Sequence, residues 1–146
     1  MVVLRLLSLV LMAIILVPSG AHLFELPAKI ALDRDDYFIV QGIYAGWAFF
    51  GIPIIAAAVA NAALALAERR RDPGAARWAG AAALLVLASL AVFFLWVFPA
   101  NQDTANWTRP PEGWEALRRH WEWGHAANAL IVFAAFLATA AAVIRR

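Results

Sequence analysis

The stretch Val2–Leu26, VVLRLLSLVLMAIILVPSGAHLFEL, is apolar over a length that matches the thickness of a lipid bilayer. A helix of roughly 20 residues crosses a hydrocarbon core of about 30 Å. Three further apolar runs follow, at roughly 37–67, 77–98 and 124–144. None shows the period-two alternation of a barrel strand, and helices are the other way to satisfy the backbone inside lipid. The chain is therefore predicted to be an all-α integral membrane four-helix bundle.

We expect a single transmembrane domain, residues 1–146, with an up-down-up-down arrangement and spans of roughly 2–26, 37–67, 77–98 and 114–144. The last span includes an interfacial first part. The composition supports this, because 64% of the residues are hydrophobic and only 15% are charged, more apolar than a soluble domain of this size can bury.

The basic residues predict an orientation rather than a nucleic-acid partner. Seven of the 12 Lys and Arg residues lie near the two chain ends or in the link from Glu68 to Arg77. Cytoplasmic loops carry such an excess, so both termini are predicted cytoplasmic. The cations form no single stripe, which excludes nucleic-acid binding. Arg5, the apolar stretch 6–17 and the small residues 19–21 also fit a secretory signal peptide, an alternative that stays open.

Polar and ionisable residues gather near the face opposite the termini. Such groups inside a span cost about 2.5 to 3.5 kcal/mol at the helix centre and are therefore usually partnered and functional. Alternating helix directions bring them to one level, so we predict a pocket between the helices, open to the outer leaflet or the aqueous side. They are His22, Glu25 and Lys29 on one face, Gln41 and Tyr44, Asn101, and then Arg118, Trp121, Glu122, His125 and Asn128 on another face.

His22-x-x-Glu25 and Glu122-x-x-His125 are mirror-image pairs, each with an imidazole and a carboxylate on one helix face. Metal-binding bundles use such pairs, and two His with one or two carboxylates suit iron, zinc or copper. A dinuclear site needs four Glu, so a single metal ion on these four residues is the metal hypothesis. Two opposed His are also compatible with a haem. A site without any cofactor and a purely structural pairing both stay open.

Other features favour packing or interfacial roles. Trp107, Trp114, Trp121 and Trp123 are interpreted as an aromatic belt at the headgroup level, with Trp121 alternatively lining a ligand site. Gly42 and Gly46 form a small-xxx-small pair that predicts close helix packing. The long loop from Pro99 to about Gly113 is of a kind that often carries function. The absence of cysteine excludes a thiolate nucleophile and a disulfide.

Four segments carry a family resemblance. They are His22-Leu23-Phe24-Glu25-Leu26-Pro27-x-Lys29, Tyr37-x-x-x-Gln41-x-x-Tyr44-x-Gly46-Trp47, Pro99-x-Asn101-x-x-x-x-Asn106-Trp107 and Trp114-Glu115-x-x-Arg118-x-x-Trp121-Glu122-x-x-His125. Together they resemble small bacterial four-helix membrane proteins of an uncharacterised family related to fungal anthrone oxygenases. The resemblance covers most of the chain and implies a bacterial inner membrane location.

Anthrone oxygenases convert an anthrone to a quinone with dioxygen, and the resemblance implies that His22 or His125 is the base that removes a phenolic or methylene proton. The catalytic candidates are His22, His125, Glu25 and Glu122. The ligand-binding candidates are Lys29, Gln41, Tyr44, Trp47, Asn101, Arg118, Trp121 and Asn128.

The sequence therefore predicts a small membrane oxidoreductase or oxygenase-like protein that binds a hydrophobic aromatic or quinone-like molecule near the outer face. The alternative is a non-enzymatic membrane protein that binds or transports a small lipophile or a metal ion in the same pocket. The expected partners are the lipid bilayer and a small hydrophobic molecule, and a homo-oligomer stays open.

Overall fold

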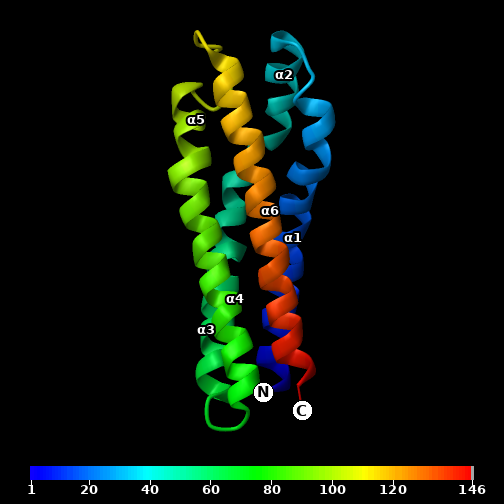
Figure 1. The fold of residues 1–146 in the computed structure, drawn as a ribbon, viewed down its shortest axis with the longest axis vertical. Helices are drawn as coiled ribbons and strands as arrows, with labels where there is room; N and C mark the ends of the chain where they lie inside the picture. Colours follow the sequence, from blue (N-terminus) through cyan, green and yellow to red (C-terminus); the bar gives the residue numbers. More distant parts are fainter. Residues whose placement is uncertain (146) are drawn as a thin grey trace.

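Four long helices stand side by side in the computed structural model, which describes residues 1–145 (Figure 1). They are α1 (Val2–Lys29), α3 (Gly51–Glu68), α4 (Pro73–Val92) and α6 (Trp114–Ile144). Both chain ends and the α3–α4 turn lie at one end of the bundle, which we call the terminal end; the opposite end is the distal end (Figure 1).

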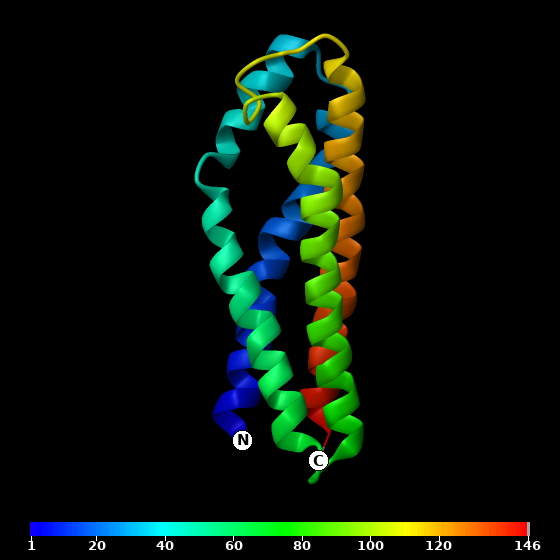
Figure 2. The same ribbon diagram turned by 90° about the vertical axis from the view of Figure 1, so that its left-hand side faces the viewer.

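Short elements complete the chain at and near the distal end. They are α2 (Arg34–Gln41), the 3-10 turns η1 (Gly42–Tyr44) and η2 (Trp47–Phe50), the π-helical η3 (Phe93–Val97) and α5 (Phe98–Asp103). Figure 2 shows α2 and the loop after α5 together over the distal end. No strand occurs within residues 1–145. Four continuous helical segments, Val2–Lys29, Trp47–Glu68, Pro73–Asp103 and Trp114–Ile144, are long and apolar enough to cross a membrane, which confirms the all-α prediction.

The bundle core is built largely from small residues. α6 packs against α1 and α4, while α3 packs against α4 and, less extensively, against α1. Buried alanines on α3, α4 and α6 let these backbones approach closely. The central cluster consists of Met12, Ile15, Ala57, Ala58, Val86, Val132 and Ala135. A hydrogen bond from Thr139 to Asn61 Oδ1, at 2.9 Å, joins α6 to α3 on the terminal side of that cluster.

Arg5 fastens three helices at the terminal end. Its Nη2 lies 2.7 Å from Glu68 Oε1 at the end of α3. Its Nη1 donates to the carbonyl oxygens of Val143, at 3.3 Å, and Arg145, at 2.9 Å. Because the last carbonyls of a helix have no partner within that helix, Arg5 caps α6 while it neutralises a buried carboxylate.

The second apolar run is not one helix, and the prediction of a continuous helix over 37–67 is wrong. The α-helix is interrupted between Gly42 and Phe50. Gly46 has a φ of 85° there, a conformation that favours glycine. A Cβ atom placed on Gly42 or Gly46 would meet nothing within 4 Å, so the predicted close packing of this pair is also wrong. Gly46 is required by the turn, which leaves Trp47–Glu68 as the apolar helical segment.

The π-helix η3 lies where α4 approaches Pro99. Proline has no backbone N–H and its ring clashes with the carbonyl four residues earlier, here that of Leu95. The helix widens instead, and the Phe98 N–H bonds to Phe93, five residues back. α6 comes close to this widened turn at Gly124, where a Cβ atom would lie 2.7 Å from Trp96 Cδ1 and 2.9 Å from Val97 Cγ2.

Candidate functional site

A buried ion pair lies at the centre of the distal end. Lys29 Nζ, from the last turn of α1, is 3.0 Å from Glu122 Oε1 on α6, and their side chains are only 4% and 0% exposed. Lys29 also donates to the Tyr44 hydroxyl at 2.8 Å. The ammonium lies 4.4 Å from the ring centroids of both Tyr44 and Trp121, so aromatic faces replace part of its lost hydration.

Two tyrosines donate to the two carboxylates of the site. Tyr37, fully buried on α2, donates to Glu122 Oε1 at 2.9 Å, and Gln41 donates to the Tyr37 hydroxyl. Tyr44 donates to Glu25. Burial, reinforced by the negative charge of Glu122, raises the pKa of the Tyr37 phenol. Tyr37 therefore stays protonated and acts as a fixed donor.

The two predicted imidazoles are stacked on each other. The ring centroids of His22 and His125 are 3.9 Å apart with an interplanar angle of 25°. The Trp121 ring stands edge-on to both, 5.1 Å from His22 and 4.2 Å from His125. His22 is buried, whereas His125 is partly exposed and lies beside Phe93. Tyr44 and Trp47 pack on His22 at 4.7 and 5.3 Å, so the histidine pair has aromatic neighbours from four segments.

Asn101 positions tryptophans rather than facing an open space. Its Oδ1 accepts from Trp107 Nε1, at 3.0 Å, and from Trp121 Nε1, at 2.8 Å. Both indoles are buried, so the interpretation of these two residues as an interfacial belt is wrong, whereas Trp123 is 59% exposed as a belt requires. Amide bonding inside the bundle satisfies the indole N–H groups that the interface would otherwise bind.

A strained loop brings Trp107 inward. Ala105, Asn106 and Trp107 have φ values of 50°, 56° and 62°, a left-handed conformation that costs energy for residues other than glycine. Thr104 compensates, because its hydroxyl donates to Ala100 O and accepts from the Trp107 N–H. The expected long loop begins only at Thr104, since α5 extends to Asp103.

Arg118 closes the outer edge of the site. Its Nη1 donates to Leu32 O at 2.6 Å, and its guanidinium lies 4.6 Å from the Trp114 ring centroid. It thereby fixes the α1–α2 link against α6. The predicted ligand-binding candidates thus fall into two groups. Asn101 and Arg118 bind other protein groups. Lys29 belongs to the ion pair, and the side chains around that pair and the histidines are Gln41, Tyr44, Trp47 and Trp121.

Several buried polar atoms of the site have no hydrogen-bond partner in the described chain. They are His22 Nδ1, Gln41 Oε1, Glu122 Oε2, Asn128 Oδ1 and Arg118 Nε. A buried polar atom without a partner costs about 1 to 3 kcal/mol, and native proteins hold few of them. Their concentration at one end of the bundle, around a completely buried carboxylate, distinguishes this end from the rest of the molecule.

The structure does not assemble the predicted four-residue metal site. Within residues 1–145, no three His, Asp or Glu side chains are arranged to hold a metal ion. The reason is visible in the contacts, because Glu25 accepts from Tyr44 and Glu122 pairs with Lys29 while the imidazoles stack face to face. One oxygen of each carboxylate is bound to another group, and the donor atoms of the four residues do not converge on one point, as coordination requires.

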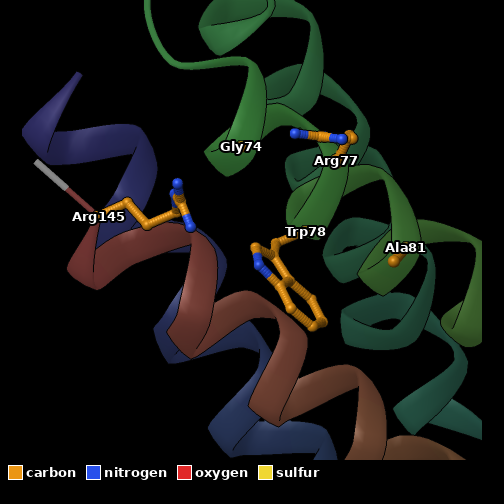
Figure 3. A pocket seen from close by; sticks show the side chains of 5 residues that line it. All are labelled: Gly74, Arg77, Trp78, Ala81 and Arg145. Carbon is orange, nitrogen blue, oxygen red and sulfur yellow. The ribbon is translucent and has the colours of Figure 1, made fainter.

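The site is closely packed in this conformation. The polar side chains that were expected to surround a pocket contact one another instead. Cavities of about 370 and 200 Å³ lie elsewhere, the first at the terminal end (Figure 3) and the second at the surface between Trp96 and Trp123. His125 is partly exposed and is one point of access to the distal site, as are the partly exposed Tyr44 and Trp47.

Sequence reasoning missed two members of the site, Tyr37 and Trp107. Tyr37 lies four residues before Gln41 and seven before Tyr44, which is the spacing of one helix face and could have identified it. Trp107 had no comparable signal, because its position depends on the left-handed backbone after Thr104. No protein-family model, curated protein or solved structure matches the chain.

Proposed function

We propose that this chain is an integral protein of a bacterial inner membrane, with both termini cytoplasmic and the distal site near the outer face. The helix lengths support this depth. At 1.5 Å per residue, His22 lies about 26 Å along α1 from Arg5, and His125 lies about 28 Å along α6 from Ile144. With a hydrocarbon core of about 30 Å, the histidine pair sits at its far boundary and the Lys29–Glu122 pair lies in the headgroup layer.

The distal site binds a lipophilic aromatic molecule that carries a hydroxyl group, such as a phenol, a quinol or an anthrone in its enol form. The observation that carries this proposal is Glu122 Oε2, a completely buried carboxylate oxygen without a partner. A carboxylate oxygen accepts hydrogen bonds, so the ligand that satisfies it has to donate one. Trp121, Trp47 and the two imidazoles supply flat faces for the ring of such a ligand.

The reaction is an oxidation of that molecule by dioxygen, as the resemblance to anthrone oxygenases implies. In the overall reaction of an anthrone, the methylene group becomes a carbonyl group, one molecule of dioxygen is consumed and one molecule of water is released. His22 or His125 takes the proton from the methylene or the hydroxyl, while the ammonium of Lys29 stabilises the resulting oxyanion. A lipophile reaches the site from the bilayer past Phe93, beside the partly exposed His125.

The test is oxygen uptake by the purified protein in detergent with an anthrone as substrate. We expect the wild type to accelerate uptake and the His22→Ala/His125→Ala double variant to lose most of this acceleration, with His120→Ala, an exposed histidine, as the matched control. Metal content and a visible spectrum of the same samples report a metal ion or a haem. Uptake that is unchanged by the double variant would refute the enzymatic proposal, and ligand binding without uptake would favour a binding or transport protein.

A further inference from the structure

The terminal end contains a positively charged cavity that the distal site does not use. It has a volume of about 370 Å³ and is lined by Gly74, Arg77, Trp78, Ala81 and Arg145. Figure 3 shows the Arg77 and Arg145 side chains approaching the cavity from α4 and from the end of α6, with the Trp78 ring between the two helices. Two guanidinium groups from separate elements therefore face one space.

The charges at this cavity are incompletely neutralised. Arg145 Nε lies 3.5 Å from Asp72 Oδ2. Arg77 Nε donates to Pro73 O at 3.3 Å, and within residues 1–145 no carboxylate lies in ion-pair distance of Arg77. The first amides of α4 are already occupied, since Gly74 and Ala75 donate to Asp72 Oδ1. The guanidinium groups are thus what remains to bind an anion, and their planar donors match the oxygens of a phosphate.

The surroundings of the cavity are apolar on the side that leads along α4. Trp78 is 47% exposed, Ala81 lines the cavity, and Leu84, one turn further, is 68% exposed. An anion bound here thus has an apolar surface directly beside it, which suits a ligand with an acyl chain. Tryptophan also favours the headgroup level of a bilayer, the depth at which phospholipid phosphates lie.

We propose that this cavity binds the phosphate group of an anionic phospholipid, held by Arg77 and Arg145, with the acyl chains along Trp78, Ala81 and Leu84. The exposed Arg69, Arg70 and Arg71 in the adjoining turn attract anionic lipids to this end without holding a particular one. The inference rests on the proposed membrane insertion but is independent of the distal site.

Gly74 determines where Arg145 lies. A Cβ atom on Gly74 would be 2.5 Å from Arg145 Nη2, so the guanidinium rests directly on the glycine. An alanine there displaces the flexible end of the Arg145 side chain while the backbone has an ordinary conformation. Gly74→Ala therefore perturbs the site without removing a charge, which separates the geometry of the cavity from its overall charge.

The experiment measures thermal unfolding of the full chain in an uncharged detergent during titration with a short-chain phosphatidylglycerol. The lipid should raise the Tm of the wild type in a saturable manner. The apparent Kd should rise about tenfold in Arg77→Gln or Arg145→Gln, the loss expected for a charge-assisted hydrogen bond, and less in Gly74→Ala. Arg70→Gln, which removes one charge from the adjoining turn, is the matched control and should bind as the wild type does.

Three results would overturn the proposal. If Arg70→Gln raises the apparent Kd for phosphatidylglycerol as much as Arg77→Gln does, the lipid is attracted to the basic turn without a specific site. Equal stabilisation by phosphatidylcholine of the same chain length would mean detergent-like binding without a phosphate site for anionic lipid. Equal stabilisation by inorganic phosphate, with the same dependence on Arg77 and Arg145, would mean a free-anion site. The Tm of each variant without lipid shows that it is folded, and oxygen uptake with an anthrone shows separately whether the distal site is intact.

Discussion

At the scale of single residues, the buried charges explain why the distal end is ordered. Lys29 and Glu122 are removed from solvent together and are tied to Tyr37, Tyr44 and Trp121. Breaking a buried pair by removing one partner leaves an uncompensated charge, which is more costly than replacing both partners. The pair therefore contributes to the specific arrangement of α1 against α6 more than to stability as such.

Lys29→Met is expected to destabilise the protein strongly, by about 3 to 5 kcal/mol, because Glu122 loses its cation. The double variant Lys29→Met/Glu122→Leu should recover most of that loss, since no buried charge remains. Unfolding in mixed detergent micelles measures both. If the destabilisation of the double variant equals the sum of the destabilisations of Lys29→Met and Glu122→Leu, the two charges are not coupled.

Asp72 gives a pH dependence at the start of α4. The backbone amide of Ala75, then that of Gly74, and the nearby Arg145 hold the pKa of this carboxyl below its ordinary value of 3.8. A lowered folded-state pKa contributes stability that is present above the unfolded value and is lost as the pH falls through the folded value. Asp72→Ala should therefore lower the Tm at pH 7 but have a shrinking effect below pH 3.8.

Exposed Asp103→Ala is the control for the Asp72 variant and should change the Tm little at either pH. A difference between wild type and Asp72→Ala that stays constant down to acidic pH would indicate that the side chain acts through packing rather than through its charge.

At the scale of elements, the widened turn η3 and the glycine opposite it position α6. Val97 of η3 belongs to a hydrophobic cluster at the distal end that includes Tyr37, Trp107 and Trp121, and Phe93 packs against this cluster. Gly124 lets α6 approach this turn, and His125 follows immediately. The close contact at Gly124 therefore sets the position of the stacked imidazoles.

Gly124→Ala should destabilise the protein by about 1 to 3 kcal/mol, since the added methyl overlaps Trp96 and Val97. Gly42→Ala is the matched control, because a Cβ atom there meets nothing and its φ is −60°. Equilibrium unfolding compares the two variants. Equal effects at the two glycines would contradict the close approach of α6 to η3.

The elements also show what sequence could and could not predict. Length and hydropathy were enough to find four apolar helical segments, because a spanning helix leaves a continuous signal of about 20 residues. The break at Gly46 was missed, since apolar residues continue through Trp47–Phe50 and hide a turn that only the backbone angle reveals. The π-helix likewise depends on how Pro99 is accommodated, which a hydrophobic pattern does not encode.

At the scale of the whole molecule, the two ends differ in chemistry. The terminal end carries arginines and few acids, whereas the distal end holds a buried polar network with aromatic walls. The common level of these residues along the bundle could be predicted from the alternating directions of the helices, so His22 and His125 were expected together and are stacked. Their actual partners could not be predicted, since the pairing of Glu25 with Tyr44 and of Glu122 with Lys29 depends on side-chain geometry between helices.

The orientation in the membrane has a direct test because the chain has no cysteine. Arg70→Cys and Glu112→Cys place single thiols in the α3–α4 turn and in the distal loop. A membrane-impermeant maleimide should label the thiol of Glu112→Cys in intact bacterial spheroplasts and that of Arg70→Cys only in inverted vesicles. The reverse pattern would place both termini outside and would contradict the charge bias.

The central claim is that Glu122 accepts a hydrogen bond from an aromatic hydroxyl at the distal end. Anaerobic titration of the purified protein with a naphthoquinol, followed by quenching of tryptophan fluorescence, tests it most directly. We expect saturable binding by the wild type and by Glu112→Gln, the exposed control, and an about tenfold higher Kd for Glu122→Gln. Binding by a folded Glu122→Gln variant with unchanged Kd, or no saturable binding by the wild type, would contradict the claim.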